Sequence, residues 1–419
     1  MKYFGTDGFR GEANVGLNAD HAYKIGRFLG WYYGSKENKK CTCVVGRDTR
    51  RSGEMFEYAI TAGLIASGAD VYLMHVTTTP SISYITHKKN FNVGIMITAS
   101  HNPFHDNGIK VINSNGYKME ENVLEEIEKY IDGLHEEIPF AQKDEIGCTV
   151  DFDEGRNIYE EYLISLANKQ PKNIKIAFDC ANGSTHDICK SVFEKLGADF
   201  NIINNKPDGF NINLNCGSTS ITALQEYVVN NKMDIGFAFD GDGDRCIMVN
   251  GKGQELNGDI ILYVCALYLK KIGKLNNNKI VTTVMANMGL YKALDKLDIG
   301  YIQTPVGDKY VAQSLTQGNY SLGGEQSGHI IFTDYDIKGD AILASIKLLE
   351  VVSEYGLDFI TNILEEVFIY PQLLVNVKIT GNSEIMEDED IKRNIKEIEE
   401  SLGEEGRYFN KEKWNRAST

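Results

Sequence analysis

Short apolar segments alternate with helix-like segments through most of the chain. The apolar segments are rich in Val, Ile and Phe and are bounded by Gly, Asp or Asn, which is typical of buried strands. The expected strands are residues 41–46, 69–74, 92–98, 175–179, 199–203, 234–240 and 279–284. Longer segments between them, such as residues 54–68, 184–197 and 259–273, end at Gly as helices often do. This alternation predicts parallel sheets covered by helices on both faces.

Three stretches repeat one plan, in which a helix, a small-residue stop and a strand follow one another. They are residues 56–74, 189–203 and 290–304. A chain of 419 residues is long enough for about three domains, so we expect three copies of one α/β unit. The expected domains are residues 1–140, 155–252 and 256–367. Residues 370–379 alternate like a half-buried strand and predict a fourth, differently built unit over 370–419.

The composition, 42% hydrophobic and 24% charged, is that of a soluble globular protein and excludes disordered, collagen-like and disulfide-stapled chains. No apolar run approaches the ~20 residues of a membrane span. The first residues, MKYFGTDGFRGE, lack the apolar stretch of a signal peptide. The net charge of −16 repels nucleic acid and anionic lipid. We therefore expect a cytoplasmic protein that handles a small molecule, with neither nucleic acid nor membrane as a partner.

The eight cysteines are scattered and form no C-x-x-C pair, which favours free thiols in a reduced compartment. Cys41 and Cys43 leave a redox or metal pair open as the alternative.

Residues 240–245, DGDGDR, follow an expected strand and carry three carboxylates at alternate positions. Glycines let such a loop bend tightly, so Asp240, Asp242 and Asp244 can converge on one cation. Oxygen ligands suit a hard ion, Mg²⁺ or Ca²⁺. An EF-hand would need Gly and Glu where Arg245 and Gly251 stand, so the sequence predicts a different metal loop.

Residues 98–103, TASHNP, also follow an expected strand and continue to DNGIK at 106–110. Ser100 offers a hydroxyl at a strand end, where α/β proteins place reactive groups. A serine hydrolase would need a G-x-S-x-G elbow, and His101 is too close in sequence to act as the base for Ser100. We therefore expect Ser100 to carry a phosphoryl group opposite the metal loop.

Residues 323–329, GGEQSGH, form a Gly-rich turn in which Glu325 and Ser327 could both face sugar hydroxyls. Taken alone, an ordinary turn and a buried structural His329 are the alternatives. Three further loops add basic groups, and each could equally be an exposed turn: residues 5–11, 46–50 and 304–310.

Together and in this order, FGTDGFRG, TASHNP with DNGIK, DGDGDR and GGEQSGH resemble the signature regions of the α-D-phosphohexomutase superfamily. The resemblance covers residues 1–407. The start of the chain and Gln326 are similar to the branch that acts on glucosamine phosphates, with the phosphomannomutase/phosphoglucomutase branch as the alternative. The implied fold class is α/β, with three similar domains of mixed sheets covered by helices and an incomplete fourth α+β domain.

The resemblance implies interconversion of glucosamine 6-phosphate and glucosamine 1-phosphate, in UDP-N-acetylglucosamine synthesis. It implies a phosphoserine at Ser100, one Mg²⁺ per chain, a hexosamine bisphosphate as intermediate and activator, and a monomer or homodimer. The implied catalytic residues are Ser100, Lys110, Arg10 and His101, with Lys110 or Arg10 moving the proton and stabilising transition-state charge. The implied metal ligands are Ser100, Asp240, Asp242 and Asp244. The implied substrate-binding residues are Glu325, Ser327, Arg245, Lys309 and His329.

Two departures from the family pattern stand out. Lys309 occupies a position where the family usually has Arg, which keeps the charge but weakens bidentate contact. The family's last phosphate-binding loop, R-x-S-G-T-E-P, is missing, and the chain ends in YFNKEKWNRAST over 408–419. Codons for residues 411–417, shifted forward by one base, can encode RKSGTEP. We therefore predict that 408–419 is read out of frame, which resequencing the coding DNA across codon 407 tests. A sugar-phosphate-binding remnant without turnover is the corresponding alternative function.

Overall fold

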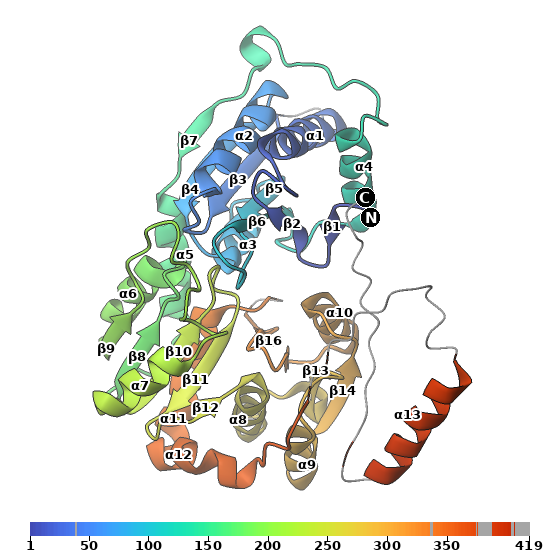
Figure 1. Cartoon of the computed structure of the whole chain (residues 1–419). Coiled ribbons are helices and arrows are strands. Elements are labelled where there is room, and N and C mark those ends of the chain that lie inside the picture. The colour runs from blue at the N-terminus through green and yellow to red at the C-terminus, as the bar shows by residue number, and fades with distance from the viewer. Residues whose placement is uncertain (38–39, 336–337, 374, 376–387, 404–405, 407–419) are drawn as a thin grey trace.

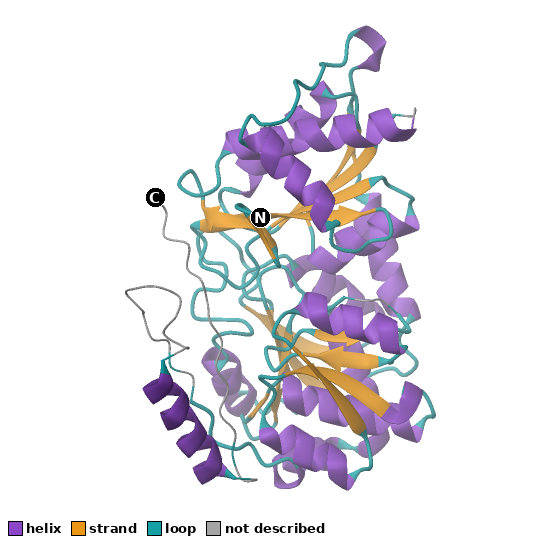
Figure 2. Ribbon diagram, turned by 90° about the vertical axis from the view of Figure 1, so that its right-hand side faces the viewer, coloured by secondary structure: helices purple, strands orange, loops and turns teal. Residues whose placement is uncertain are grey.

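The computed structural model describes residues 1–37, 40–335, 338–373, 375, 388–403 and 406. Within these residues the chain builds three sheets, and Figure 2 shows helices packed on both sides of the strands. The expected α/β fold class is therefore confirmed. No helix in the described part of the chain is both long and apolar enough to cross a membrane.

The first unit is the upper part of Figure 1, and its described residues form a seven-stranded sheet in the order β1-β2-β6-β5-β3-β4-β7. The central strand β5 is buried along its whole length, as its continuous run VGIMI predicts. The strands are β1 (Phe4–Gly5), β2 (Gly8–Glu12), β3 (Thr42–Arg47), β4 (Asp70–Val76), β5 (Val93–Ile97), β6 (Asp106–Asn113) and β7 (Thr149–Asp151). The helices are α1 (Ala19–Glu37), α2 (Gly53–Ala66), α3 (Thr79–Lys88), α4 (Glu121–Ile131) and a 3₁₀ turn at Lys143–Glu145.

The second unit lies below the first and carries, among described residues, a five-stranded sheet in the order β12-β11-β10-β8-β9. Its strands are β8 (Lys175–Asp179), β9 (Asp199–Ile203), β10 (Ile235–Phe239), β11 (Cys246–Asn250) and β12 (Glu255–Leu256). Its helices are α5 (Glu154–Ser165), α6 (Thr185–Lys195) and α7 (Thr222–Asn230).

The third unit carries, within the described ranges, a four-stranded sheet in the order β14-β13-β15-β16. Its strands are β13 (Lys279–Thr283), β14 (Gly300–Thr304), β15 (Leu322–Gly324) and β16 (Ile330–Phe332). Its helices are α8 (Gly258–Lys271), α9 (Met288–Lys296), α10 (Asp308–Gly318), α11 (Ala341–Tyr355), α12 (Leu357–Glu366) and a 3₁₀ turn at Asn276–Asn278.

The expected fourth unit is described only in part. Helix α13 (Glu389–Leu402) stands apart from the three sheets in Figure 1. Most of the expected strand at 370–379 and all of the tail at 408–419 lie outside the described residues. The fourth unit and the frame of its tail therefore stay predictions.

The three sheets are mixed, as the resemblance implies, and not parallel throughout, as the alternation alone would suggest. Each sheet contains an antiparallel hairpin: β5 with β6, β10 with β11, and β15 with β16. The connections within these hairpins are too short for a parallel crossover, which needs a dozen or more residues. These three short connections carry the three chemical motifs, at residues 98–105, 240–245 and 325–329. The repeat in the sequence thus places one functional loop at the same topological position in each unit.

The second and third units share a hydrophobic core, whereas the first unit has its own main core. One cluster of buried side chains runs from Phe178 and Phe237 in the second unit to Ile280 and Leu348 in the third. The first unit has a separate main core around Phe28. The second and third units therefore form one packed body, against which the first unit is placed.

All eight cysteines are free thiols, and all except the exposed Cys148 are buried. Burial raises the pKa of the Cys43 thiol well above its ordinary value, which disfavours the thiolate that redox or metal chemistry needs. The interpretation of Cys41 and Cys43 as small buried side chains is therefore the better one.

Candidate active site

Ser100 lies in the connection between β5 and β6 and is 1% exposed. Its Oγ donates a hydrogen bond of 2.6 Å to Oδ2 of Asp240, in the loop of the second unit. The backbone φ of Ser100 is +53°, a left-handed conformation that is uncommon for residues other than glycine. Such a conformation persists only where the surroundings hold it.

A buried arginine holds this serine loop. The side chain of Arg50 is fully buried, and its Nε lies 2.8 Å from Oδ2 of the equally buried Asp48. Its guanidinium donates to backbone carbonyls of the serine loop, namely those of Ser100, Asn102, Pro103 and Asp106. The carboxylate of Asp48 also accepts from Thr98 Oγ1 at 2.7 Å, and Thr98 Oγ1 accepts from the Ser100 N–H at 2.9 Å. Arg50 therefore positions Ser100 without touching the Oγ.

Replacing Arg50 by methionine is expected to lower kcat about 100-fold, because a misplaced reacting group loses that much when its supports are removed. If Ser100 carries a phosphoryl group, as the sequence predicts, the rate of its transfer in single-turnover experiments should fall in parallel. The matched control is Arg51→Met, which removes the neighbouring exposed arginine and should leave kcat within about twofold. An Arg50→Met chain with normal kcat would show that the loop holds its shape unaided.

The acidic loop at 240–245 follows β10, and its three carboxylates converge. One oxygen each from Asp240, Asp242 and Asp244 lies within 4.8 Å of the others. Asp240 and Asp242 are completely buried, and the side chain of Asp244 is 12% exposed. Gly243, with φ of +74°, supplies the left-handed turn that brings them together.

The donor set fits a hard divalent cation. Oδ1 of Asp242 and Oδ1 of Asp244 are buried and have no hydrogen-bond partner among the described residues. Burial, together with the charges of Asp244 and Asp242, raises the pKa of Asp240 well above its ordinary value. Three closely spaced carboxylates, two of them with an unused oxygen, favour a bound cation, and an all-oxygen set is the choice of Mg²⁺ or Ca²⁺.

Lys110 on β6 lies against this triad. Its Nζ is 2.6 Å from Oδ2 of Asp242 and 3.2 Å from Oδ2 of Asp244. Burial disfavours its charge, but the two carboxylates outweigh burial and raise the pKa of Lys110 above its ordinary value. Lys110 is therefore a cation at neutral pH, suited to stabilise negative charge on a phosphoryl group.

His101 lies beside the Ser100 hydroxyl, and two arginines lie near His101. His101 Nδ1 is 3.4 Å from Ser100 Oγ, and burial, with Arg245 and Arg10 nearby, lowers the pKa of His101 to about 4. Arg10 on β2 lies 3.5 Å from Asp7, and its Nε has no hydrogen-bond partner among the described residues. Arg245 Nε lies 3.9 Å from Oδ1 of Asp244. A neutral imidazole thus lies beside the Ser100 hydroxyl, with the positive charges of Arg10 and Arg245 near that imidazole.

The Gly-rich turn of the third unit connects β15 to β16. Glu325 Oε1 accepts from the Gly307 N–H at 3.1 Å, and Ser327 Oγ is buried without a hydrogen-bond partner in the described part of the chain. The Gly328 carbonyl accepts from the Cys246 N–H at 3.0 Å, which ties the turn to the strand after the acidic loop. His329 Nδ1 lies 3.8 Å from Oδ1 of Asp244.

The structure thus brings together residues from all three units that lie far apart in the sequence. Lys309 is placed differently from the other expected substrate-binding residues, because its Nζ contacts Glu121 in the first unit. Sequence reasoning missed Thr79, whose Oγ1 donates to Oδ2 of Asp242, and Asn213, whose Nδ2 donates to the Ser100 carbonyl at 2.9 Å. Neither stands in a motif. Arg50 lies in one of the basic loops noted in the sequence, residues 46–50. Its hydrogen bonds to the serine loop depend on tertiary contacts that the sequence does not show.

Three segments of the chain match α/β/α domains of the phosphoglucomutase/phosphomannomutase family: residues 1–137 match domain I, 157–253 domain II and 257–368 domain III. Over 411 residues the chain is 54% identical to the phosphoglucosamine mutase of Lachnoclostridium phytofermentans, covering 98% of this chain and 91% of that protein. A phosphoglucomutase/phosphomannomutase family protein of Burkholderia thailandensis has a similar structure, with a TM-score of 0.73 and 24% identity over 86% of this chain and 79% of that one. The N-acetylphosphoglucosamine mutase of Aspergillus fumigatus, solved with GlcNAc-6P and magnesium, gives a TM-score of 0.65 at 16% identity, covering 95% and 88%.

The fold and the three converging loops define a phosphohexomutase, and the chain belongs to the phosphoglucomutase/phosphomannomutase family. Within that family its sequence places it with the phosphoglucosamine mutases.

Proposed function

We propose that this chain interconverts glucosamine 6-phosphate and glucosamine 1-phosphate through a phosphoserine at Ser100, in the supply of UDP-N-acetylglucosamine. The observation that supports this most is the 2.6 Å contact of Ser100 Oγ with Asp240 inside a buried carboxylate triad. Phosphoryl transfer needs a hydroxyl next to a site for a hard cation, with basic side chains close to that site.

Each turnover has two transfers. In the first, the bond between Ser100 Oγ and phosphorus breaks, and phosphorus bonds to the sugar O1, giving a hexosamine bisphosphate and a free serine. The bisphosphate then reorients within the site. In the second transfer, the bond between the sugar O6 and phosphorus breaks and the Ser100 phosphate forms again. A proton passes from the sugar O1 hydroxyl to Ser100 Oγ and then to O6. His101, whose Nδ1 lies 3.4 Å from Oγ, would relay this proton in place of Lys110 or Arg10, the residues that the resemblance implies for that role.

Asp240, Asp242, Asp244 and the phosphate on Ser100 would hold one Mg²⁺. The ion, when bound, neutralises charge on the transferring phosphoryl group. Lys110 and Arg10 add positive charge where negative charge develops, and the raised pKa of Lys110 keeps it in the charged form.

The sugar would lie between Ser100 and the turn of the third unit. Glu325 and Ser327 would hold its hydroxyls in either orientation, and the unpaired Ser327 Oγ supports this role. Arg245 and His329 border the same space. We further propose that the hexosamine bisphosphate also primes the enzyme, and that the protein works in the cytoplasm as a monomer or homodimer.

The test is turnover of glucosamine 6-phosphate by this chain, primed with a bisphosphate and followed by phosphorus NMR, which separates 6-phosphates from 1-phosphates. Glucose 6-phosphate and mannose 6-phosphate are the matched alternatives. We expect kcat/KM for the amino sugar to exceed both by about tenfold or more, because a site built to hydrogen-bond a group rejects analogues lacking it. Equal rates would favour a phosphomanno- or phosphoglucomutase. Binding without turnover of any hexose phosphate would favour the remnant without catalysis.

A further inference from the structure

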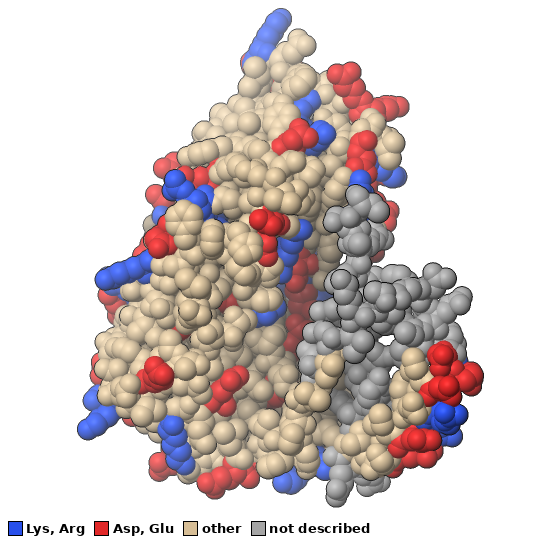
Figure 3. Space-filling model, in the orientation of Figure 1, with Lys and Arg blue, Asp and Glu red and all other residues tan. Residues whose placement is uncertain are grey.

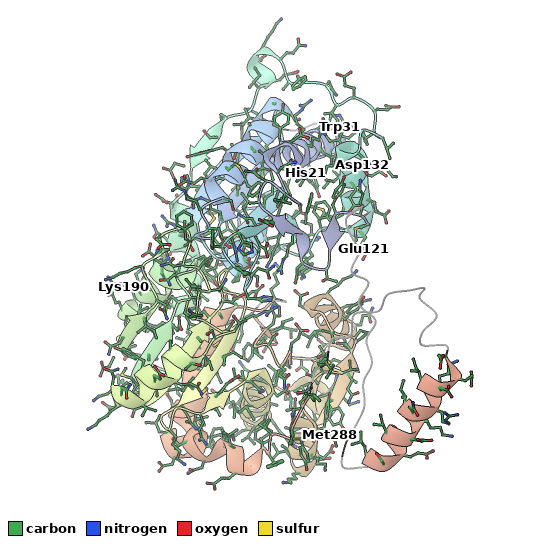
Figure 4. The ribbon with its side chains drawn as sticks, viewed as in Figure 1. His21, Trp31, Glu121, Asp132, Lys190 and Met288 are labelled. Atoms are coloured by element: carbon green, nitrogen blue, oxygen red, sulfur yellow. The ribbon has the colours of Figure 1, made fainter. Side chains whose placement is uncertain are left out.

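Two ion pairs join the first unit to the third unit beside the site. Lys118, which follows β6, places its Nζ 2.7 Å from Oδ1 of Asp308 at the start of α10. Glu121, at the start of α4, contacts Lys309, the next residue of α10. Figure 4 labels Glu121 at the edge of the upper part that faces α10, and Figure 3 shows acidic and basic side chains in the hollow between the upper and lower parts. The two pairs have opposite polarity, so each unit contributes one cation and one anion.

The Lys118–Asp308 pair is connected to both halves of the site. On one side, Lys118 Nζ also donates to the Thr6 carbonyl at 2.8 Å and to Asp7 at 3.0 Å, in the hairpin that presents Arg10. On the other side, Asp308 directly follows Gly307, whose N–H donates to Glu325 at 3.1 Å. The pair therefore links the part that faces the phosphate to the part proposed to hold the sugar.

The opposite side of the first unit is joined differently. There the chain passes from β7 into α5, and Tyr84 of α3 stacks on Tyr162 of α5 with ring centroids 4.0 Å apart. The second and third units share one hydrophobic core and therefore form one packed body. Between the two sides, the first unit also contacts the second at the site itself, through Ser100–Asp240 and Lys110–Asp242. A covalent and aromatic connection on one side of the site, with ionic contacts on the far side, is the arrangement of a hinge and a closing contact.

We propose that the Lys118–Asp308 pair, supported by Glu121–Lys309, is an ionic latch that retains the bisphosphorylated sugar between the two transfers. This inference rests on the proposed function, in which the intermediate has no covalent bond to the protein. Lys118 is 40% exposed and Lys309 41% exposed, and ion pairs at such exposure contribute little individually. The latch therefore opens readily for product release, yet biases the cleft toward closure. Its members act through position and not as catalytic residues.

The experiment follows the fate of the phosphoryl group on Ser100. The full chain is charged with ³²P from labelled glucose 1,6-bisphosphate and mixed with glucosamine 6-phosphate in a single turnover. Lys118→Met should raise the fraction of label released as free bisphosphate about fivefold, as expected for loss of one such contact. The first transfer, read as loss of label from Ser100, should keep its wild-type rate. Lys129→Met is the matched control, because Lys129 pairs with Glu126 inside α4 and crosses no boundary between units.

The second pair gives an independent check. Glu121→Lys and Lys309→Glu should each raise bisphosphate release, and the double exchange should restore the wild-type fraction. If Lys118→Met transfers no label, small-angle X-ray scattering decides: a larger radius of gyration than wild type supports the latch, and an equal radius overturns it. A wild-type fraction of released bisphosphate in Lys118→Met also overturns it. Label that stays on Ser100 of the wild-type chain would instead overturn the proposed function.

Discussion

Replacing Ser100 by alanine is expected to abolish interconversion of hexosamine phosphates, with a loss of about 10⁴-fold or more in kcat, because the substitution removes the hydroxyl proposed to carry the phosphoryl group. Incubation with labelled glucose 1,6-bisphosphate should leave the variant unlabelled. The free energy of unfolding should fall by only about 1–2 kcal/mol, the cost of leaving Asp240 without its hydroxyl partner. Phosphorus NMR, mass spectrometry of the labelled peptide and chemical denaturation measure the three quantities.

Ser345→Ala is the matched control for this substitution. Ser345 is also completely buried, and its Oγ donates at 2.8 Å to a carbonyl within helix α11. The control should lose a similar amount of stability while keeping label incorporation and turnover. If Ser100→Ala still took up label at the wild-type rate, the phosphoserine would have to be placed elsewhere in the chain.

Replacing Asp240 by asparagine is expected to uncouple folding stability from magnesium. In the wild-type chain, Mg²⁺ at 100 times its Kd should raise the free energy of unfolding by about 2.7 kcal/mol. Asparagine keeps the oxygen that accepts from the N–H groups of Asp244 and Arg245 but removes one charge from the triad. The stabilisation by Mg²⁺ should therefore disappear, and kcat should fall about 100-fold or more.

The stability of the metal-free variant distinguishes loss of a metal site from general destabilisation of the fold. Because burial and two neighbouring carboxylates disfavour the charge on Asp240, its removal should leave the metal-free variant at least as stable as the metal-free wild type. Denaturant titrations with EDTA and with Mg²⁺ measure both differences. A variant that loses stability in EDTA, yet still gains with Mg²⁺, would contradict a metal site at this loop.

Much of the site could be predicted because its chemistry is concentrated in short segments. Asp240, Asp242 and Asp244 lie within five residues of one loop, which keeps their carboxylates close together. Their spacing alone therefore predicts a cation site. Ser100 follows a strand whose apolar run is easily recognised. The three loops that carry these groups prove to be equivalent hairpin connections, which explains why one strand-and-loop pattern recurs along the chain.

Other parts could not be predicted because they depend on residues far apart in the chain. The sequence shows residues 106–110 only as a segment that follows the serine loop, because no local signal indicates that β6 returns antiparallel between β2 and β5. Arg50 looked like one of several loop arginines, and its four backbone contacts depend on where residues 100–106 fold. The pairing of Lys118 with Asp308 joins residues 190 positions apart, for which periodicity carries no information.

The sequence by itself determined the α/β class, the phosphohexomutase family, the carboxylate triad and the serine opposite it. The α/β class and the carboxylate triad follow from local periodicity and from spacing within single loops, where bond geometry limits the possible arrangements. The family follows from the resemblance of four motifs and their order to known signature regions. Only the tertiary structure decided which strands run antiparallel, which arginine holds Ser100, and that Lys309 faces Glu121 across the cleft. Those features depend on how the three units pack against one another. That packing is decided by many contacts between residues far apart in the chain, which the local sequence pattern does not show.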